Sequence, residues 1–193
     1  MTVTVHASGT KTMDIGTFTV TIASPAVFSK TNQLAAGDKV VFSTTGALPT
    51  GLTPGTTYYV IAAGLSGTEF QVSATDGGAA VNTSGGQSGT HSMVAEHFLT
   101  TTTTAATYTL DTDLNALAAG DVLEIRCYKM ALAGGEPRPY IMSKFPDAQP
   151  PDDLIQTSIP VSTPLSDARA IRWSLKQTYG TARAVPYSVN KYA

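Results

Sequence analysis

The sequence predicts an all-β protein built from two tandem β-sandwich modules, residues 1–93 and residues 94–193, of an immunoglobulin-like or jelly-roll-like kind. Three observations predict this fold class. Thr, Ser, Gly, Val and Tyr are abundant, whereas only 13% of the residues are charged. Short segments that alternate apolar and polar residues are separated by turn clusters, at the spacing typical of sandwiches. Finally, one pentapeptide occurs twice and leads into an alternating segment both times.

The repeated pentapeptide is LAAGD, at positions 34–38 and 117–121, where it precedes KVVFS and VLEIRCY. Its chemistry fits a loop that enters a strand. Leucine can reach a core, glycine tolerates a positive φ, and aspartate can accept hydrogen bonds from nearby main-chain N–H groups. The copies are 83 positions apart, which is the length of a small domain. We interpret both copies as a loop that enters a core strand, one in each module. The alternative is a coincidence between two ordinary turns.

Six strands are expected in the first module, at residues 2–6, 17–22, 39–43, 57–62, 69–73 and 90–94. Turn clusters such as LPTGLTPGT and SGGQSG separate them. Within YYVI, Tyr58 and Val60 are expected to face one side, with Tyr59 and Ile61 on the other, because side chains alternate along a strand. Positions 40–68 carry no charge, but their prolines and glycines exclude a membrane-spanning helix.

The second module begins with the threonine-rich run 100–110, which we interpret as an exposed edge strand rather than a linker, since threonine is β-branched. Segments 122–130 and 140–145 are expected to form a hairpin around the adjacent glycines 134 and 135. Three prolines in FPDAQPPDDL then favour an extended, irregular connection.

The C-terminal segment AIRWSLKQTYG predicts another strand, because Ile171, Trp173 and Leu175 alternate with polar residues. A short helix capped by Ser166 is the alternative, but an apolar period of two favours the strand. Gly180 is then expected to turn the chain into a last strand within ARAVPYSV.

Cys127 is the single cysteine, so no intramolecular disulfide is expected. It shares the alternation of Leu123 and Ile125, which predicts a buried thiol that packs as a small apolar side chain rather than a nucleophile. The N-terminal MTVTVHASGT has neither the basic region nor the apolar core of a signal peptide. We therefore expect synthesis and folding in a reducing compartment.

Metal-binding patterns are weak. DTDLN at 111–115 begins like a helix-loop-helix calcium loop, but Ala116 and Val122 stand where glycine and glutamate are needed. Asp111 and Asp113 are thus expected to be turn residues. The histidines lack close metal-ligand spacing; they are His6, His91 and His97. No metal site and no cofactor is predicted.

Catalytic patterns are equally weak. GGQSG lacks the lysine and the following helix of a phosphate-binding loop. Asp152 and Asp153 are adjacent, so on an extended chain they point to opposite sides and cannot easily act as an acid–base pair. No nucleophile elbow is present. The sequence therefore predicts a protein that is not an enzyme and has no catalytic residues.

Charge argues against nucleic-acid and membrane partners, because the formal net charge is −2. The charged residues are uneven, with 7 at positions 1–92 and 19 at positions 93–193. A local basic stripe of Arg169, Arg172, Lys176 and Arg183 stays open as an alternative, and it would suit an acidic protein surface as well as phosphate.

Two long stretches resemble known proteins. The stretch VVFSTTGALPTGLTPGTTYYVIAAGLSGTEFQVSAT, with GGAAVNTSGGQSGTHS after it, resembles a small β module of tailed-bacteriophage tail and fibre proteins and of bacterial surface repeats. LAAGDVLEIRCYKMALAGGEPR, with IRWSLKQTYGTAR near the end, is similar to small virion proteins from the structural gene block of tailed phages. Together the stretches cover most of the chain.

This resemblance implies a virion structural protein without catalysis, located on the capsid exterior or in the tail and made in the host cytoplasm. The leading hypothesis is a capsid decoration (cement) protein that docks on the major capsid protein through the second module. A tail or tail-fibre component, oligomeric and with host glycans as a candidate partner, is the second hypothesis, and a bacterial surface adhesion module is the third. A homo-oligomer on the particle is expected.

Four residues of the second module are the candidate partner contacts, namely Arg126, Tyr128, Arg172 and Trp173. For Trp173, a place in the core is the preferred interpretation, since its large apolar ring continues the apolar face of its strand.

Overall fold

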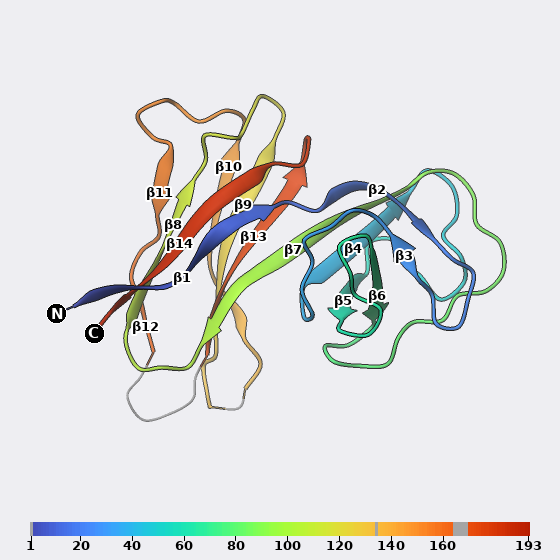
Figure 1. Cartoon of the computed structure of the whole chain (residues 1–193), viewed down its shortest axis with the longest axis horizontal. Coiled ribbons are helices and arrows are strands. Elements are labelled where there is room, and N and C mark those ends of the chain that lie inside the picture. The colour runs from blue at the N-terminus through green and yellow to red at the C-terminus, as the bar shows by residue number, and fades with distance from the viewer. Residues whose placement is uncertain (1, 134, 164–169) are drawn as a thin grey trace. The chain divides into compact units, whose positions relative to one another are not determined.

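The computed structural model describes residues 2–133, 135–163 and 170–193, and in these ranges it contains strands and no helix (Figure 1). The predicted all-β class is confirmed. The chain divides into two compact units. Met13–His97 forms one, which we call the inserted unit. The other, which we call the discontinuous unit, joins the N-terminal segment ending at Thr12 to Phe98–Ala193.

This division differs from the predicted tandem arrangement, with its boundary between residues 93 and 94. The first strand, β1 (Val3–Thr12), pairs along its length with the last strand, β14 (Ala184–Tyr192). Beyond them, Thr2 and Ala193 exchange two main-chain hydrogen bonds, and the chain ends lie side by side in Figure 1. Pairing between the two ends of a chain leaves no local sequence pattern, which is why a contiguous first module was predicted.

The inserted unit is a closed, six-stranded antiparallel barrel rather than the predicted sandwich. Its strands are β2 (Ile15–Val20), β3 (Phe28–Ser29), β4 (Lys39–Thr44), β5 (Thr57–Ile61), β6 (Glu69–Ser73) and the first part of β7 (His91–Thr102). The ring runs β7, β2, β3, β6, β5, β4 and back to β7. Closure depends on β7, whose two edges pair with β2 and β4, so the barrel has no open edge.

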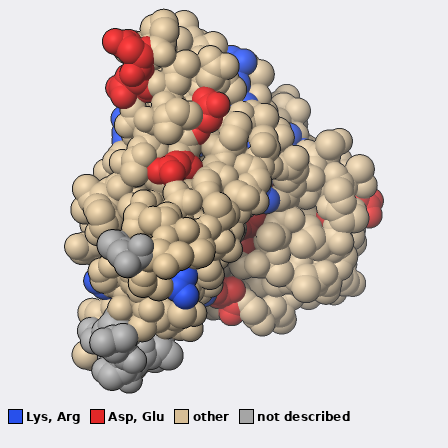
Figure 2. Space-filling view, turned by 60° about the vertical axis from the view of Figure 1, so that its left-hand side comes forward, with Lys and Arg blue, Asp and Glu red and all other residues tan. Residues whose placement is uncertain are grey.

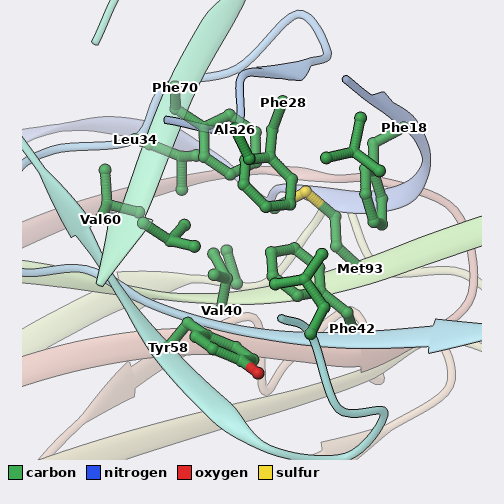
Figure 3. Packing of buried hydrophobic residues seen from close by; sticks show 14 residues of the cluster. Phe18, Ala26, Phe28, Leu34, Val40, Phe42, Tyr58, Val60, Phe70 and Met93 are labelled. Carbon is green, nitrogen blue, oxygen red and sulfur yellow. The ribbon is translucent and has the colours of Figure 1, made fainter. Parts of the chain in front are cut away.

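Aromatic rings fill the barrel interior (Figure 3). The rings of Phe28 and Phe42 stack with centroids 4.9 Å apart and an interplanar angle of 7°. The Phe70 and Phe28 rings also stack, with centroids 5.1 Å apart, and the Phe18 and Phe42 ring centroids are 4.9 Å apart. The predicted alternation in β5 is confirmed. Tyr58 and Val60 are buried in this core, whereas Tyr59 and Ile61 are half-buried. The two-residue strand β3 is too short to show a pattern and was not predicted.

The discontinuous unit contains two sheets. One has the order β1, β14, β8 (Thr107–Asp113) and β11 (Ile155–Thr157), with β12 (Val161–Ser162) also paired to β8. The other has the order β10 (Arg138–Pro146), β9 (Val122–Lys129), β13 (Ile171–Tyr179) and β7. The predicted hairpin of β9 and β10 is confirmed. The expected single strand at 100–110 is instead the end of β7 and the start of β8.

The core of this unit is formed by the inward-facing residues of β8, β9, β13 and β14, which alternate with more exposed residues along each strand. Ile171, Trp173 and Leu175 are at most 1% exposed, which confirms the predicted strand and its apolar face. The expected turn at Gly180 is present, with φ 93°. It does not make a hairpin, because β13 pairs with β9 while β14 pairs with β1 and β8. The chain therefore passes from one sheet to the other at this glycine.

Candidate functional site

Three of the four candidate contact residues lie together on the face of the β9–β13 pair opposite to Trp173, where Arg126 and Arg172 are half-buried and Tyr128 is buried, with 4% of it exposed. Arg172 is directly opposite Tyr128 in the antiparallel register. The Tyr128 ring meets the Phe98 ring edge-on, with centroids 5.6 Å apart, and the Arg172 guanidinium lies 5.4 Å from the Phe98 ring centroid. Arg126 donates a hydrogen bond from Nη1 to the Tyr128 hydroxyl at 3.4 Å. Two strands thus assemble a cation–aromatic cluster.

An ion pair anchors this cluster. Arg126 Nη2 binds Glu124 Oε2 at 2.5 Å, and the two side chains are 20% and 12% exposed. Lys176 on β13 and Lys144 on β10 flank Glu124 in the register. The cluster therefore has one carboxylate among several cations, which are held in place by neighbouring strands, and it has a net positive charge.

Trp173 does not join this cluster. Its register partner is Cys127, on the opposite face of the same strands, and its side chain is 1% exposed. The preferred interpretation as a core residue is confirmed. Cys127 is likewise buried, and burial raises the pKa of its thiol to about 12, as expected for a packed thiol rather than a nucleophile.

A cavity of about 140 Å³ lies next to Trp173, between the two sheets of the discontinuous unit. Leu110, Ile125 and Trp173 contribute to its wall from the core side. Core-facing residues of β10 and the segment from β11 to Ile159 complete the lining. The Trp173 Nε1 is buried and has no hydrogen-bond acceptor among the described residues.

Exposed large apolar side chains are concentrated in the discontinuous unit. Of the nine found among the described residues, eight belong to it: Val3, Val5, Leu132, Tyr140, Met142, Ile155, Ile159 and Tyr179. In the inserted unit the one such residue within the described ranges is Ile22. Charged side chains are sparse and scattered on the face shown in Figure 2. The two units thus present surfaces of different character.

The two LAAGD segments adopt the same turn. Asp38 Oδ2 accepts the Ala35 N–H at 2.9 Å, and Asp121 Oδ2 accepts the Ala118 N–H at 2.8 Å. The glycine before each aspartate has a positive φ, 91° and 85° respectively. Strands β4 and β9 begin at the next residue. The prediction that both copies mark a loop entering a core strand is confirmed.

In the inserted unit the turn aspartate binds a histidine. His97 is fully buried, and its Nδ1 lies 3.1 Å from Asp38 Oδ2. The Asp14 N–H donates to His97 Nε2 at 3.1 Å, so the geometry assigns the ring proton to Nδ1, which donates to Asp38. Asp14 Oδ2 in turn accepts the Gln33 N–H at 2.8 Å. The imidazole therefore connects three loop and strand segments of the barrel.

In the discontinuous unit the turn aspartate binds an arginine. Asp121 Oδ2 accepts a hydrogen bond from Arg183 Nε at 2.6 Å, and Oδ1 accepts the Thr181 N–H at 3.0 Å. Burial by itself would raise the pKa of Asp121, but the hydrogen bonds from Ala118, Arg183 and Thr181 outweigh it and hold the pKa below its ordinary value.

This ion pair also bears on the basic stripe that the sequence left open as an alternative. Arg183 is bound to Asp121, whereas Arg172 and Lys176 lie on the side of β13 opposite to Trp173. Arg169 is outside the described residues. The stripe of four cations is therefore not seen as one feature in the described structure.

The inserted unit carries a hydroxyl-rich surface groove along β2 and the segment 87–91. His91 Nδ1 lies 2.9 Å from Thr44 Oγ1, and its Nε2 lies 3.1 Å from Gln87 Oε1. Gln87 Nε2 donates to the Val20 carbonyl at 3.0 Å. Polar side chains are therefore fixed in orientation at one side of this groove.

No group of three or more histidine, cysteine, aspartate or glutamate residues suited to a metal ion occurs in the described ranges. Asp111 and Asp113 lie at the end of β8 rather than in a turn ahead of a strand. Asp111 accepts hydrogen bonds from Thr157 and Asn190, and Asp113 accepts the Asn115 N–H. Both aspartates thus have structural partners.

Comparison with known proteins finds no matching family, no matching curated protein and no matching solved structure. In the described ranges, no helix is long and apolar enough to cross a membrane.

Sequence reasoning missed the buried partners of the two turn aspartates and the cavity beside Trp173. The repeat itself was a usable signal for the aspartates, because a carboxylate fixed next to a core strand requires a hydrogen-bonding partner. The partner residues, His97 and Arg183, are 59 and 62 positions away in sequence. No local pattern connects them to the repeat.

Proposed function

We propose that this chain is a non-catalytic structural protein of a tailed-bacteriophage virion. In this proposal it is a capsid decoration protein that docks on the major capsid protein through the discontinuous unit, while the inserted barrel faces solvent. It assembles in the host cytoplasm, as expected for a protein whose one cysteine is a buried thiol.

The uneven distribution of exposed apolar side chains supports the proposal most directly. Large apolar residues left in water cost free energy, so a concentration of them on one unit is typical of a surface that another protein covers. In the part of the chain that the structure describes, eight of nine such residues belong to the discontinuous unit. That unit also carries the half-buried cations Arg126 and Arg172, and arginine is enriched at protein interfaces.

The structure of the inserted barrel is consistent with a unit that faces solvent in the assembled particle. A closed barrel leaves no free strand edge for unwanted pairing, and this one exposes a single large apolar residue, Ile22, within its described residues. Such a unit can project into solvent without promoting aggregation.

The hydroxyl-rich groove near His91 favours a second candidate, a tail or tail-fibre component that binds host glycans. Fixed amide, imidazole and hydroxyl groups are suitable partners for sugar hydroxyls. A glycan array with the full chain tests this candidate, and His91→Ala should abolish any signal that depends on the groove.

Copy number decides between the candidates. Quantitative mass spectrometry of purified virions would give the ratio of this protein to the major capsid protein. A ratio near that of the shell lattice supports decoration. A few copies per particle would replace it with the tail role, and absence from virions would overturn both.

A further inference from the structure

The cavity beside Trp173 lies at an open side of the discontinuous unit. β10 is the end strand of one sheet and β11 is the end strand of the other, so within the described residues each pairs on one edge only. β11 has three residues, whereas β10 has nine. The shorter strand leaves part of β10 without an opposing partner.

The side chains of β10 are more exposed than those of β9 because β11 covers only part of the strand. Its core-facing residues are Ile141, Ser143 and Phe145, which lie opposite Cys127, Ile125 and Leu123 of β9. Ile141 and Phe145 are half-buried and Ser143 is exposed, although their β9 partners are all buried. A half-open slot therefore leads from the edge of β10 to the cavity.

One residue that lines the cavity, Trp173, carries a buried donor without a partner in the described part of the chain. Trp173 lines the cavity with its side chain 1% exposed, and its Nε1 has no acceptor among the described residues. A buried N–H without an acceptor is energetically unfavourable, and an incoming acceptor would remove this penalty. The slot thus offers an apolar space, a hydrogen-bond donor and a free strand edge.

We propose that this slot receives an extended segment of the protein on which the chain assembles, added as a strand along the free edge of β10. One apolar side chain of that segment enters the cavity, and an acceptor on the segment pairs with Trp173 Nε1. The inference rests on the proposed docking function and specifies which part of the discontinuous unit contacts the partner protein.

The dimensions and charge of the slot define the segment. A cavity of about 140 Å³ is close to the volume of roughly 150 Å³ that accommodates a benzene-sized group. Leucine, isoleucine, methionine or phenylalanine has the right size for the inserted side chain. β10 carries Arg138 and Lys144 and no acidic residue, which favours a neutral or acidic segment. A free strand edge supplies main-chain hydrogen bonds for such a segment.

The test uses the full chain and phage particles that lack it. Ser143→Phe places a ring at the slot entrance and should reduce binding to the particles at least tenfold in a co-sedimentation assay, with thermal unfolding unchanged. The matched control is Ser8→Phe, which adds the same ring to the exposed edge strand β1 of the same unit and should bind like the wild type.

Hydrogen exchange supplies a second readout. On particle binding, peptides that cover β10 and β11 should gain protection in the wild type, because a new strand pairs with β10, while β5 of the barrel should not change. A ligand held only in the cavity would leave the β10 amides exchanging freely and would overturn the strand-addition proposal.

The outcomes separate the two proposals. If the wild type does not bind the particles, the docking function fails. If the wild type and Ser143→Phe bind equally, the slot inference is overturned and the docking function stands. If sedimentation velocity without particles shows a wild-type oligomer that Ser143→Phe abolishes, the occupant is a second copy of this chain, which also overturns the inference.

Discussion

Asp38 and Asp121 occupy the same position in two identical turns, and each carboxylate is 1% exposed. Each accepts the main-chain N–H three residues before it and then binds one ionisable side chain from a distant segment. In the barrel that side chain is the His97 imidazole, and in the discontinuous unit it is the Arg183 guanidinium. The repeated letters thus encode one local turn, which the two units use to hold different long-range partners.

Asp121→Asn should destabilise the discontinuous unit by about 2–4 kcal/mol at pH 7, because four donors converge on a buried carboxylate and an amide nitrogen cannot accept from them. The folded-state pKa of Asp121 lies below the ordinary value of 3.8, so its contribution is present above that pH and is lost as pH falls through the folded-state pKa.

Urea unfolding at pH 7, 5 and 3 measures this effect. The difference in unfolding free energy between wild type and Asp121→Asn should be constant from pH 7 to 5 and smaller at pH 3. Asp113→Asn, at a partly exposed position in the same unit, is the control and should change stability little. A difference that grows on acidification would contradict the assignment.

His97→Ala should destabilise the inserted barrel by about 3–5 kcal/mol, because it leaves the Asp38 carboxylate and the Asp14 N–H buried without their imidazole partner. His97→Gln keeps a hydrogen-bonding group and should cost less. Thermal unfolding followed by near-ultraviolet circular dichroism separates the two variants. Equal melting temperatures for all three proteins would show that the histidine is not a structural anchor.

Phe42→Ala should destabilise the barrel by about 3–5 kcal/mol, since Phe42 is fully buried and its ring contacts those of Phe18, Phe28 and Tyr58. Ile61→Ala, on the half-buried outer side of β5, is the matched control and should cost about 1 kcal/mol or less. Chemical denaturation gives both values, and similar losses for the two variants would be inconsistent with the core shown in Figure 3.

Cys127 should resist thiol reagents in the folded protein, because burial raises its pKa to about 12 and almost no thiolate exists at pH 8. Labelling with iodoacetamide should become fast only in denaturant. Mass spectrometry of the intact chain over time provides the measurement, and rapid labelling of the native protein would show that this part of the core opens readily.

Strand positions were largely predictable from the sequence, because the alternation of side chains is a local property of extended chain. Ile171, Trp173 and Leu175 show this clearly, and their burial matches their alternation. The same periodicity sets the faces of the candidate contact residues, whose role as partner contacts stays a prediction. Arg126, Tyr128 and Arg172 do lie together, while Trp173 is on the other face, as strand periodicity requires.

The sequence by itself determined the all-β class, the faces of the main strands, the burial of Cys127 and the turn that both LAAGD segments form. Each of these depends on residues within a few positions of one another. Only the tertiary structure decided that β1 pairs with β14, that β7 closes a barrel, and that His97 and Arg183 complete the two aspartate sites. Any strand edge can form main-chain hydrogen bonds with many others, so the choice of partner depends on which arrangement buries the apolar faces of the whole chain.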